Sequence, residues 1–230
     1  MKKTFDINEY WERNKLIGKY GILYLDKELL GIAKTDFVMI GTQTRSLKDS
    51  ILKTFFHAND PQKVAIISLP RYWRDMDELP KTLKQCVDNG FDLIVLDDFE
   101  WLDCDTQEGQ DVRDGLIKAI HIAQDAGATI VVFSVLELPT REGYDIIPDE
   151  SAFVGLYRAI MSATQVITFA PANDNNTGIW CRICKNRNGG ITGNVAKLTY
   201  MPSTESFKPG YDLCAANYSG ARISFLEHVD

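Results

Sequence analysis

The sequence predicts an α/β domain with a mostly parallel central sheet, helices on both faces of that sheet and an antiparallel meander added at one edge. Short, almost continuous apolar runs alternate with segments whose apolar residues recur at helical spacing. A parallel strand that helices cover on both faces needs apolar side chains on both of its own faces, which produces such unbroken runs. A change to alternating apolar and polar residues after Pro139 predicts the meander.

The strands and helices of the parallel part alternate along the chain. The first apolar run stops at Gly41 and the second at Pro70, which is typical of strands that end at a sheet edge. Gly90 and Gly127 stand where glycine commonly ends a helix. The predicted strands are 36–41, 63–69, 91–97 and 128–134, and the predicted helices are 6–20, 50–57, 79–89 and 111–125.

The meander is predicted from three later strands, at 165–170, 178–184 and 193–200, with Gly, Asn and Asp turns between them. From Met201 onward the sequence is loop-like and predicts no regular element. No internal repeat or low-complexity linker interrupts the chain. Its 230 residues correspond to about one to one and a half average domains, so we expect a single core.

The charge balance excludes some classes of partner. A net charge of -7 makes the chain a poor candidate for binding nucleic acid on its own, because phosphate contacts need a positive surface. The sequence contains no run of about 18 apolar residues and no secretory signal, so we expect no membrane partner. The five scattered cysteines fit a reducing cytosol, which predicts a cytoplasmic protein.

Two of these cysteines, Cys181 and Cys184, form a CxxC motif inside a predicted strand. Residues three apart on a strand point to opposite faces of the sheet. No second CxxC or paired histidine motif accompanies them. The sequence therefore favours a structural role for this motif over a zinc or redox site.

The connection after the first strand, Gly41-Thr-Gln-Thr-Arg-Ser-Leu-Lys-Asp-Ser50, has the position of a phosphate-binding loop. In such a loop helix N-terminal amides and a lysine hold the phosphates, glycines let the backbone approach, and a hydroxyl after the lysine binds Mg²⁺. Lys48 has the place of the lysine, but Leu47 replaces the glycine and Asp49 the hydroxyl. The alternative is an ordinary β–α connection that contains a lysine by chance.

A carboxylate ends the third predicted strand. Asp97 is placed to orient a metal ion or a water at the carboxyl edge of the sheet. The alternative is a turn in which the segment 97–99, Asp-Asp-Phe, caps the next helix. Lys48 and Asp97 support each other, because both would border one crevice.

Together these features are similar to the C-terminal ATPase domain of DnaB-type replicative helicases, a hexameric RecA-like family. The similarity covers roughly residues 22–208 and implies a RecA-like P-loop NTPase core, with an N-terminal helical extension at 1–21 and a C-terminal tail at 209–230. The segments that carry it are 25–41, 63–69, 93–97, 131–136 and Lys185-Asn-Arg-Asn-Gly-Gly-Ile-Thr-Gly193, the last being similar to the family's Lys-x-Arg-Asn-Gly segment.

The resemblance implies two sets of functional residues. Lys48 matches the phosphate-binding lysine and Asp97 the Walker B aspartate. Lys185 and Arg187 match the lysine and the arginine finger that reach into the neighbouring subunit's ATP site, where they neutralise transition-state charge. A basic β-turn is the alternative for these two residues. The nucleotide-binding residues that the resemblance implies are Gly41, Lys48, Asp49, Ser50 and Asp97.

The same resemblance indicates that the chain's own catalytic machinery is damaged. Besides the changes at Leu47 and Asp49, Pro70 stands where the family keeps its catalytic glutamate and Val135 where it keeps a sensor glutamine. Loss of a group that activates water removes a rate factor of about 10²–10⁴. We therefore expect no catalytic residue and, as cofactor, at most weakly bound ATP with Mg²⁺.

Three hypotheses follow. The first is a catalytically impaired DnaB-like domain that acts through protein contacts in DNA replication, as a modulator, loader or inhibitor of a replicative helicase or in a ring of its own. The second is a divergent but active ATP-dependent DNA helicase. The third is a RecA-like scaffold without nucleotide. Aromatic residues that would anchor its partner, unless they only pack in the core, are Tyr10, Trp11, Tyr211 and Tyr218.

The segment 139–158 bears on DNA binding, because the resemblance implies DNA-facing loops there. Its acidic residues outnumber its basic ones. We therefore expect DNA contact to be weak at most.

Overall fold

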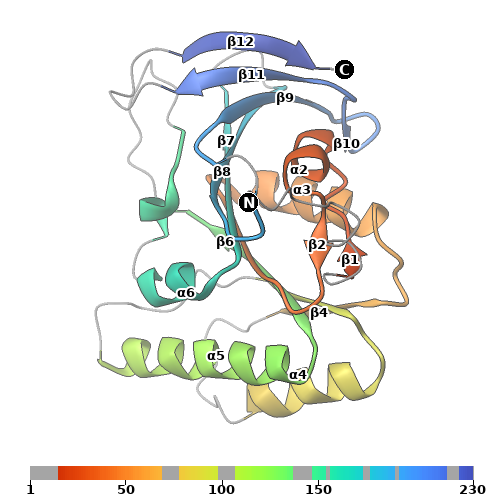
Figure 1. The fold of residues 1–230 in the computed structure, drawn as a ribbon, viewed down its shortest axis with the longest axis vertical. Coiled ribbons are helices and arrows are strands. Elements are labelled where there is room, and N and C mark those ends of the chain that lie inside the picture. Colours follow the sequence, from red (N-terminus) through yellow and green to blue (C-terminus); the bar gives the residue numbers. More distant parts are fainter. Residues whose placement is uncertain are drawn as a thin grey trace, which may run out of the picture.

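A twisted sheet runs through the molecule, and helices cover both of its faces (Figure 1). The computed structural model describes residues 15–68, 78–97, 107–136, 147–153, 156–172, 177–189, 192–216 and 223–229. The parallel strands are β3 (Phe37–Thr42), β4 (Val64–Ser68), β5 (Leu93–Asp97), β6 (Thr129–Val135) and β7 (Gln165–Pro171). They pair in the order β4-β5-β6-β3-β7, which confirms the predicted mostly parallel core.

Antiparallel strands extend the sheet beyond β7. They are β8 (Gly178–Asn186), β9 (Val195–Met201), β11 (Tyr211–Ala216) and β12 (Ile223–Val229), with the short β10 (Ser206–Phe207) paired to β9. The alternating pattern assigns 165–170 to this meander, but β7 lies parallel to β3, so the meander begins only at β8. The prediction of a loop-like segment from Met201 is wrong, because β11 and β12 pair antiparallel with each other, and β11 also pairs with β9.

The amino-terminal part of the described chain forms a small unit of its own on the sheet. β1 (Leu16–Gly18) pairs antiparallel with β2 (Ile32–Ala33), and α2 (Leu23–Glu28) lies between them in sequence. The helix predicted over 6–20 is therefore wrong at its end; residues 1–14, with Tyr10 and Trp11, lie outside the described residues. The Asp26 carboxylate shapes this unit by accepting the amides of residues 20 and 21, at 2.7 and 3.1 Å.

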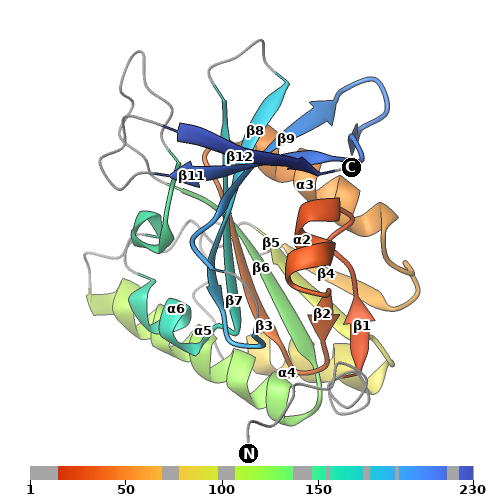
Figure 2. The ribbon, with the colours of Figure 1, turned by 45° about the horizontal axis from the view of Figure 1, so that its top comes forward.

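The helices lie in two layers (Figure 2). α2 and α3 (Arg45–His57) cover one face of the sheet, whereas α4 (Glu78–Asp88), α5 (Gln107–Asp125) and α6 (Tyr157–Ser162) cover the other. Strand β3 shows the division, since Val38 and Ile40 face the first layer and Phe37 and Met39 face the second. None of the helices that the structure describes is long and apolar enough to cross a bilayer.

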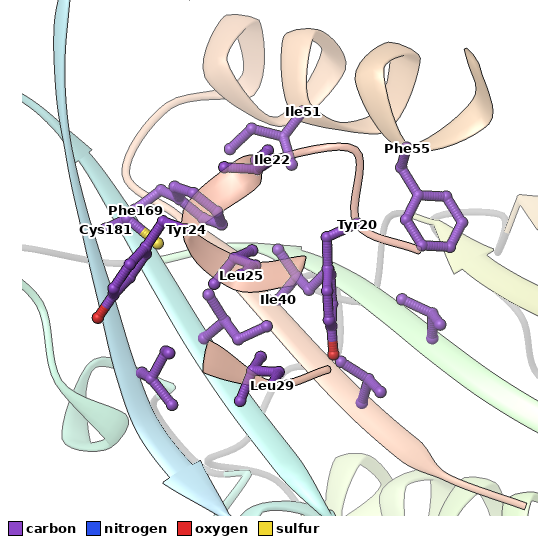
Figure 3. Close-up of a cluster of buried hydrophobic side chains, with 14 of the residues drawn as sticks. Tyr20, Ile22, Tyr24, Leu25, Leu29, Ile40, Ile51, Phe55, Phe169 and Cys181 are labelled. Carbon is purple, nitrogen blue, oxygen red and sulfur yellow. The ribbon is translucent and has the colours of Figure 1, made fainter. Parts of the chain in front are cut away.

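Two tyrosines from the amino-terminal unit reach deep into the core beneath α3 (Figure 3). The Tyr20 hydroxyl donates to Oε1 of Gln165, and both side chains are buried. The Tyr24 hydroxyl donates to the carbonyl of Asn194 at 3.1 Å, and its ring lies 5.0 Å from that of Tyr211. Tyr211 is buried, so it packs in the core, whereas Tyr218 lies outside the described residues.

The Tyr20–Gln165 pair predicts a measurable difference between two conservative substitutions. Tyr20→Phe leaves a buried amide oxygen without a donor, so we expect it to lower the free energy of unfolding by about 1–3 kcal/mol. Tyr24→Phe frees a backbone carbonyl in a partly exposed position that water can serve, and we expect a smaller loss. Urea unfolding of both variants measures the difference. Equal losses would contradict a special role for the buried pair.

Candidate functional site

The carboxyl edge of the parallel strands forms the candidate site. The chain leaves β3 to form α3 on one face of the sheet, and after β6 it packs α6 on the other face. β3 and β6 are adjacent in the sheet, with Thr42 opposite Val135 at the end of both strands. Connections that leave adjacent strands toward opposite faces open a crevice at the carboxyl ends, and ligands of open α/β sheets bind there.

Lys48 and Asp97 meet at this edge. The Lys48 ammonium of α3 lies 2.7 Å from Oδ1 of Asp97 at the end of β5, and the two side chains are 2% and 16% exposed. The structure thus brings together the two residues that the sequence expects beside one crevice. Removing one partner of a buried ion pair costs about 3–5 kcal/mol, so neither charge leaves the other easily.

The connection between β3 and α3 is short. Only Gln43 and Thr44 separate the strand from the helix, which begins at Arg45 and not at Ser50 as the apolar spacing predicts. The Thr44 hydroxyl accepts the amide of Leu47 at 3.2 Å, and the Thr44 carbonyl accepts the amide of residue 48. A threonine N-cap therefore already satisfies one of the amides that a phosphate loop would offer to its ligand.

Two residues of the expected loop are used in packing. Leu47 is buried in the apolar cluster beneath α2 and α3, where a glycine would leave a void. Gly41 lies inside β3, and a Cβ atom there would come within 2.5 Å of both Leu136 and Phe153. The missing side chain of Gly41 thus makes room for these two core residues. The sequence missed Leu136 and Phe153, because neither lies near Gly41 in the chain.

The other residues that the resemblance places at the nucleotide site differ in their surroundings. Asp49 is exposed on α3, and the Ser50 hydroxyl donates to the carbonyl of Ser46 at 3.0 Å. Val135 is half-buried at the end of β6, and Pro70 lies outside the described residues. A capped amide, a filled space at Gly41 and a paired lysine do not fit a phosphate cradle with bound Mg²⁺. Nucleotide binding by Gly41, Lys48, Asp49, Ser50 and Asp97 stays a prediction.

Lys185 and Arg187 lie at the opposite edge of the sheet. β8 runs antiparallel to β7, so that Asn186 lies opposite Gln165 at the start of β7. Both cationic side chains donate to backbone carbonyls at the end of α6: Lys185 to those of residues 160 and 161, and Arg187 to that of residue 161. Cations at a helix C-terminus are favourable, since the last carbonyls carry partial negative charge. Burial lowers the pKa of Lys185, and the nearby Arg187 charge lowers it further.

The CxxC motif lies within β8, and its two thiols face opposite sides of the sheet. Cys181 is buried in the cluster with α2 and α3, whereas Cys184 packs against the cluster on the other face. Burial raises the pKa of Cys184 to about 12, so this thiol stays protonated at neutral pH. The described residues contain no group of three or more His, Cys, Asp or Glu side chains that could hold a metal ion.

The strand order and the likeness to solved structures show a RecA-like α/β fold. No protein-family model and no curated protein sequence matches the chain. A KaiC-like protein from the hyperthermophilic archaeon Pyrococcus horikoshii OT3 superposes with a TM-score of 0.62 at 13% identity, over 84% of this chain and 98% of that chain. A DnaB-like replicative helicase, described with its interactions with primase, superposes with a TM-score of 0.60 at 12% identity, over 90% and 68% of the two chains.

These similarities bear on the fold. Identities of 12% and 13% show a shared architecture with both proteins but do not transfer the activity of either. In all, 519 solved chains match, so the architecture by itself does not single out one function.

The packing at Gly41 predicts the effect of adding one methyl group. Gly41→Ala places a Cβ within 2.5 Å of Leu136 and Phe153, and we expect the overpacking to lower the free energy of unfolding by about 1–3 kcal/mol. Gly90→Ala serves as the control that separates overpacking from backbone strain, because Gly90 has a φ of +84° but nothing within 4 Å of the added atom. A Gly41→Ala protein as stable as the wild type in urea would contradict this packing.

Proposed function

We propose that this RecA-like domain does not run an ATPase cycle of its own and acts through contacts with other RecA-like subunits in DNA replication, as a modulator, loader or inhibitor of a replicative helicase. The observation that carries the proposal is the buried ion pair between Lys48 and Asp97, next to a capped and tightly packed β3–α3 connection. This geometry favours a structural role for the residues that resemble a nucleotide site.

The electrostatics of the carboxyl edge support this proposal. A phosphate at Lys48 would lie beside the Asp97 carboxylate that the ammonium already binds at 2.7 Å, so two anions would compete for one cation. Every 1.4 kcal/mol or so that this competition costs lowers the affinity for the phosphate about tenfold. ATP with Mg²⁺ is therefore held weakly at most, with Lys48 and Asp97 as its remaining contacts.

The amino edge supports action on a neighbour. Lys185 and Arg187 lie at the end of the sheet opposite Lys48, so they cannot serve the crevice of their own chain. Arg187 is exposed, although its guanidinium donates to α6. A ring in which the amino edge of one subunit meets the carboxyl edge of the next would bring this arginine to a neighbouring nucleotide site.

The first test of the proposal is ATP hydrolysis. We expect background rates for the wild type, with and without single-stranded DNA, and the same rates for Lys48→Met. We expect the free energy of unfolding of Lys48→Met to fall by about 3–5 kcal/mol, because the change breaks the ion pair between the buried Lys48 and the half-buried Asp97. Lys53→Met is the control on the same helix: it breaks the exposed pair with Glu205 and leaves both quantities nearly unchanged. DNA-stimulated hydrolysis that Lys48→Met abolishes would support an active helicase.

The second test is association with a replicative helicase. We expect Arg187→Ala to weaken the binding of the helicase by about tenfold or more, since arginines often carry interface energy. Arg158→Ala is the matched control: this arginine is exposed like Arg187, but it lies on α6 itself and pairs with Asp114 of α5. Thermal unfolding of both variants verifies that the domain stays folded. Equal binding by wild type and Arg187→Ala would favour a scaffold that uses another surface.

A further inference from the structure

Asp36, just before β3, and Phe37, the first residue of β3, hold the turn that follows β8 and carries Arg187. The side-chain amide of Asn188 donates to both carboxylate oxygens of Asp36, at 3.0 and 3.1 Å. The two residues are 152 positions apart in the sequence. This direct contact ties the turn to the strand that leads into α3.

The carboxylate that receives this amide is buried. Asp36 is 4% exposed, and its Oδ2 also accepts the amide of Ala33 at 2.8 Å. Burial raises the pKa of Asp36, while hydrogen bonds from Asn188, Ala33 and Thr164 lower it in part. A buried carboxylate is costly without hydrogen-bond donors, so losing the Asn188 amide would destabilise Asp36. This cost keeps the Asn188 side chain in its position.

A second connection runs through Thr164. The backbone amide of Thr164 donates to the carbonyl of Phe37 at 2.8 Å, and the carbonyl of Thr164 accepts the amide of Arg187 at 2.8 Å. The Thr164 hydroxyl also bonds both the amide and the carbonyl of Phe37, at 3.1 and 2.9 Å. Residues 187 and 188 are therefore each fastened to the base of β3, one through Thr164 and one directly.

These contacts close a ring of hydrogen bonds around the turn. The ring uses the backbone of Arg187 and the side chain of Asn188, and it leaves the Arg187 side chain to other partners. Asn186 completes the turn from within, since its side chain accepts the amide of Asn188 at 3.1 Å. The backbone that carries the arginine is thus fixed independently of where the guanidinium points.

We propose that Asp36 and Asn188 are positioning residues, which hold the Lys185–Arg187 segment rigid for docking onto a RecA-like neighbour. The inference rests on the proposed function for the neighbour, but the ring of hydrogen bonds stands without it. A rigid turn lowers the ordering cost of binding, because the backbone does not have to be immobilised on contact. Asp36 is also joined by β3 to the helix that holds Lys48, so both edges depend on the same strand.

Amide hydrogen exchange of the full chain tests the ring directly. Asn188→Ala should raise the exchange rate of the Arg187 amide about tenfold or more, while the central amides of β8 keep their rates. Asp36→Asn should have a smaller effect, because one oxygen still faces the Asn188 amide. The exchanged pair, Asp36→Asn with Asn188→Asp, puts amide and carboxylate in each other's places and should restore much of the protection. An unchanged Arg187 amide in Asn188→Ala, or an equal rise throughout β8, overturns the inference.

Binding to a replicative helicase tests whether this ring of hydrogen bonds positions Arg187 for docking. Asn188→Ala, which keeps the arginine side chain, should weaken binding as Arg187→Ala does, and the exchanged pair should recover it. If Arg187→Ala weakens binding and Asn188→Ala does not, the positioning role is overturned and the proposed function survives. If neither variant changes binding, the proposed function fails, and hydrogen exchange still decides whether Asp36 and Asn188 hold the turn.

Discussion

The ion pair between Lys48 and Asp97 governs the carboxyl edge of the sheet. It joins α3 to the end of β5, although β6 separates β5 from the strand that precedes α3. A buried ammonium requires its carboxylate, so the first turn of α3 has to lie over the ends of these strands. The short Thr44-capped connection then follows, because no longer loop is needed to bring Lys48 there. One electrostatic constraint thus accounts for a connection that is short and closed.

Strand β3 links this edge to the opposite one. Its carboxyl end leads to Lys48, and its amino end begins beside the Asp36 carboxylate that receives Asn188. At both ends a buried charge is satisfied by a residue from a distant part of the chain. The two edges differ in the solvent exposure of their cationic side chains. Lys48 at the carboxyl edge is buried, whereas Arg187 at the amino edge is exposed. This asymmetry supports the proposal that the domain acts through contact with another subunit.

The similarity to solved RecA-like structures concerns the fold, whereas the side chains at the carboxyl edge decide which chemistry this fold can carry. A shared architecture at 12–13% identity establishes how the strands are ordered but says nothing about which loop residues remain chemically competent. The residues at the expected loop positions show how that part of the chain is used in this fold. Leu47 fills core space where the resemblance expects a glycine, and Gly41 makes room for Leu136 and Phe153. At this edge one glycine and one helix amide are thus used within the fold itself.

The sequence by itself determined the parallel core and its order along the chain, because strands buried on both faces require unbroken apolar runs, and Gly90 and Gly127, both at positive φ, end their helices as expected. It also placed Lys48 and Asp97 at one edge, since carboxyl ends of parallel strands meet there. Only the tertiary structure decided the direction of β7, the strands after Met201 and the bond between Asp36 and Asn188. The pairing of β7 with β3 and the Asp36–Asn188 bond join segments that lie far apart in the sequence, and local spacing carries no record of such contacts. β11 and β12 pair with each other and with β9, but their residues lack the strict alternation that predicts a strand.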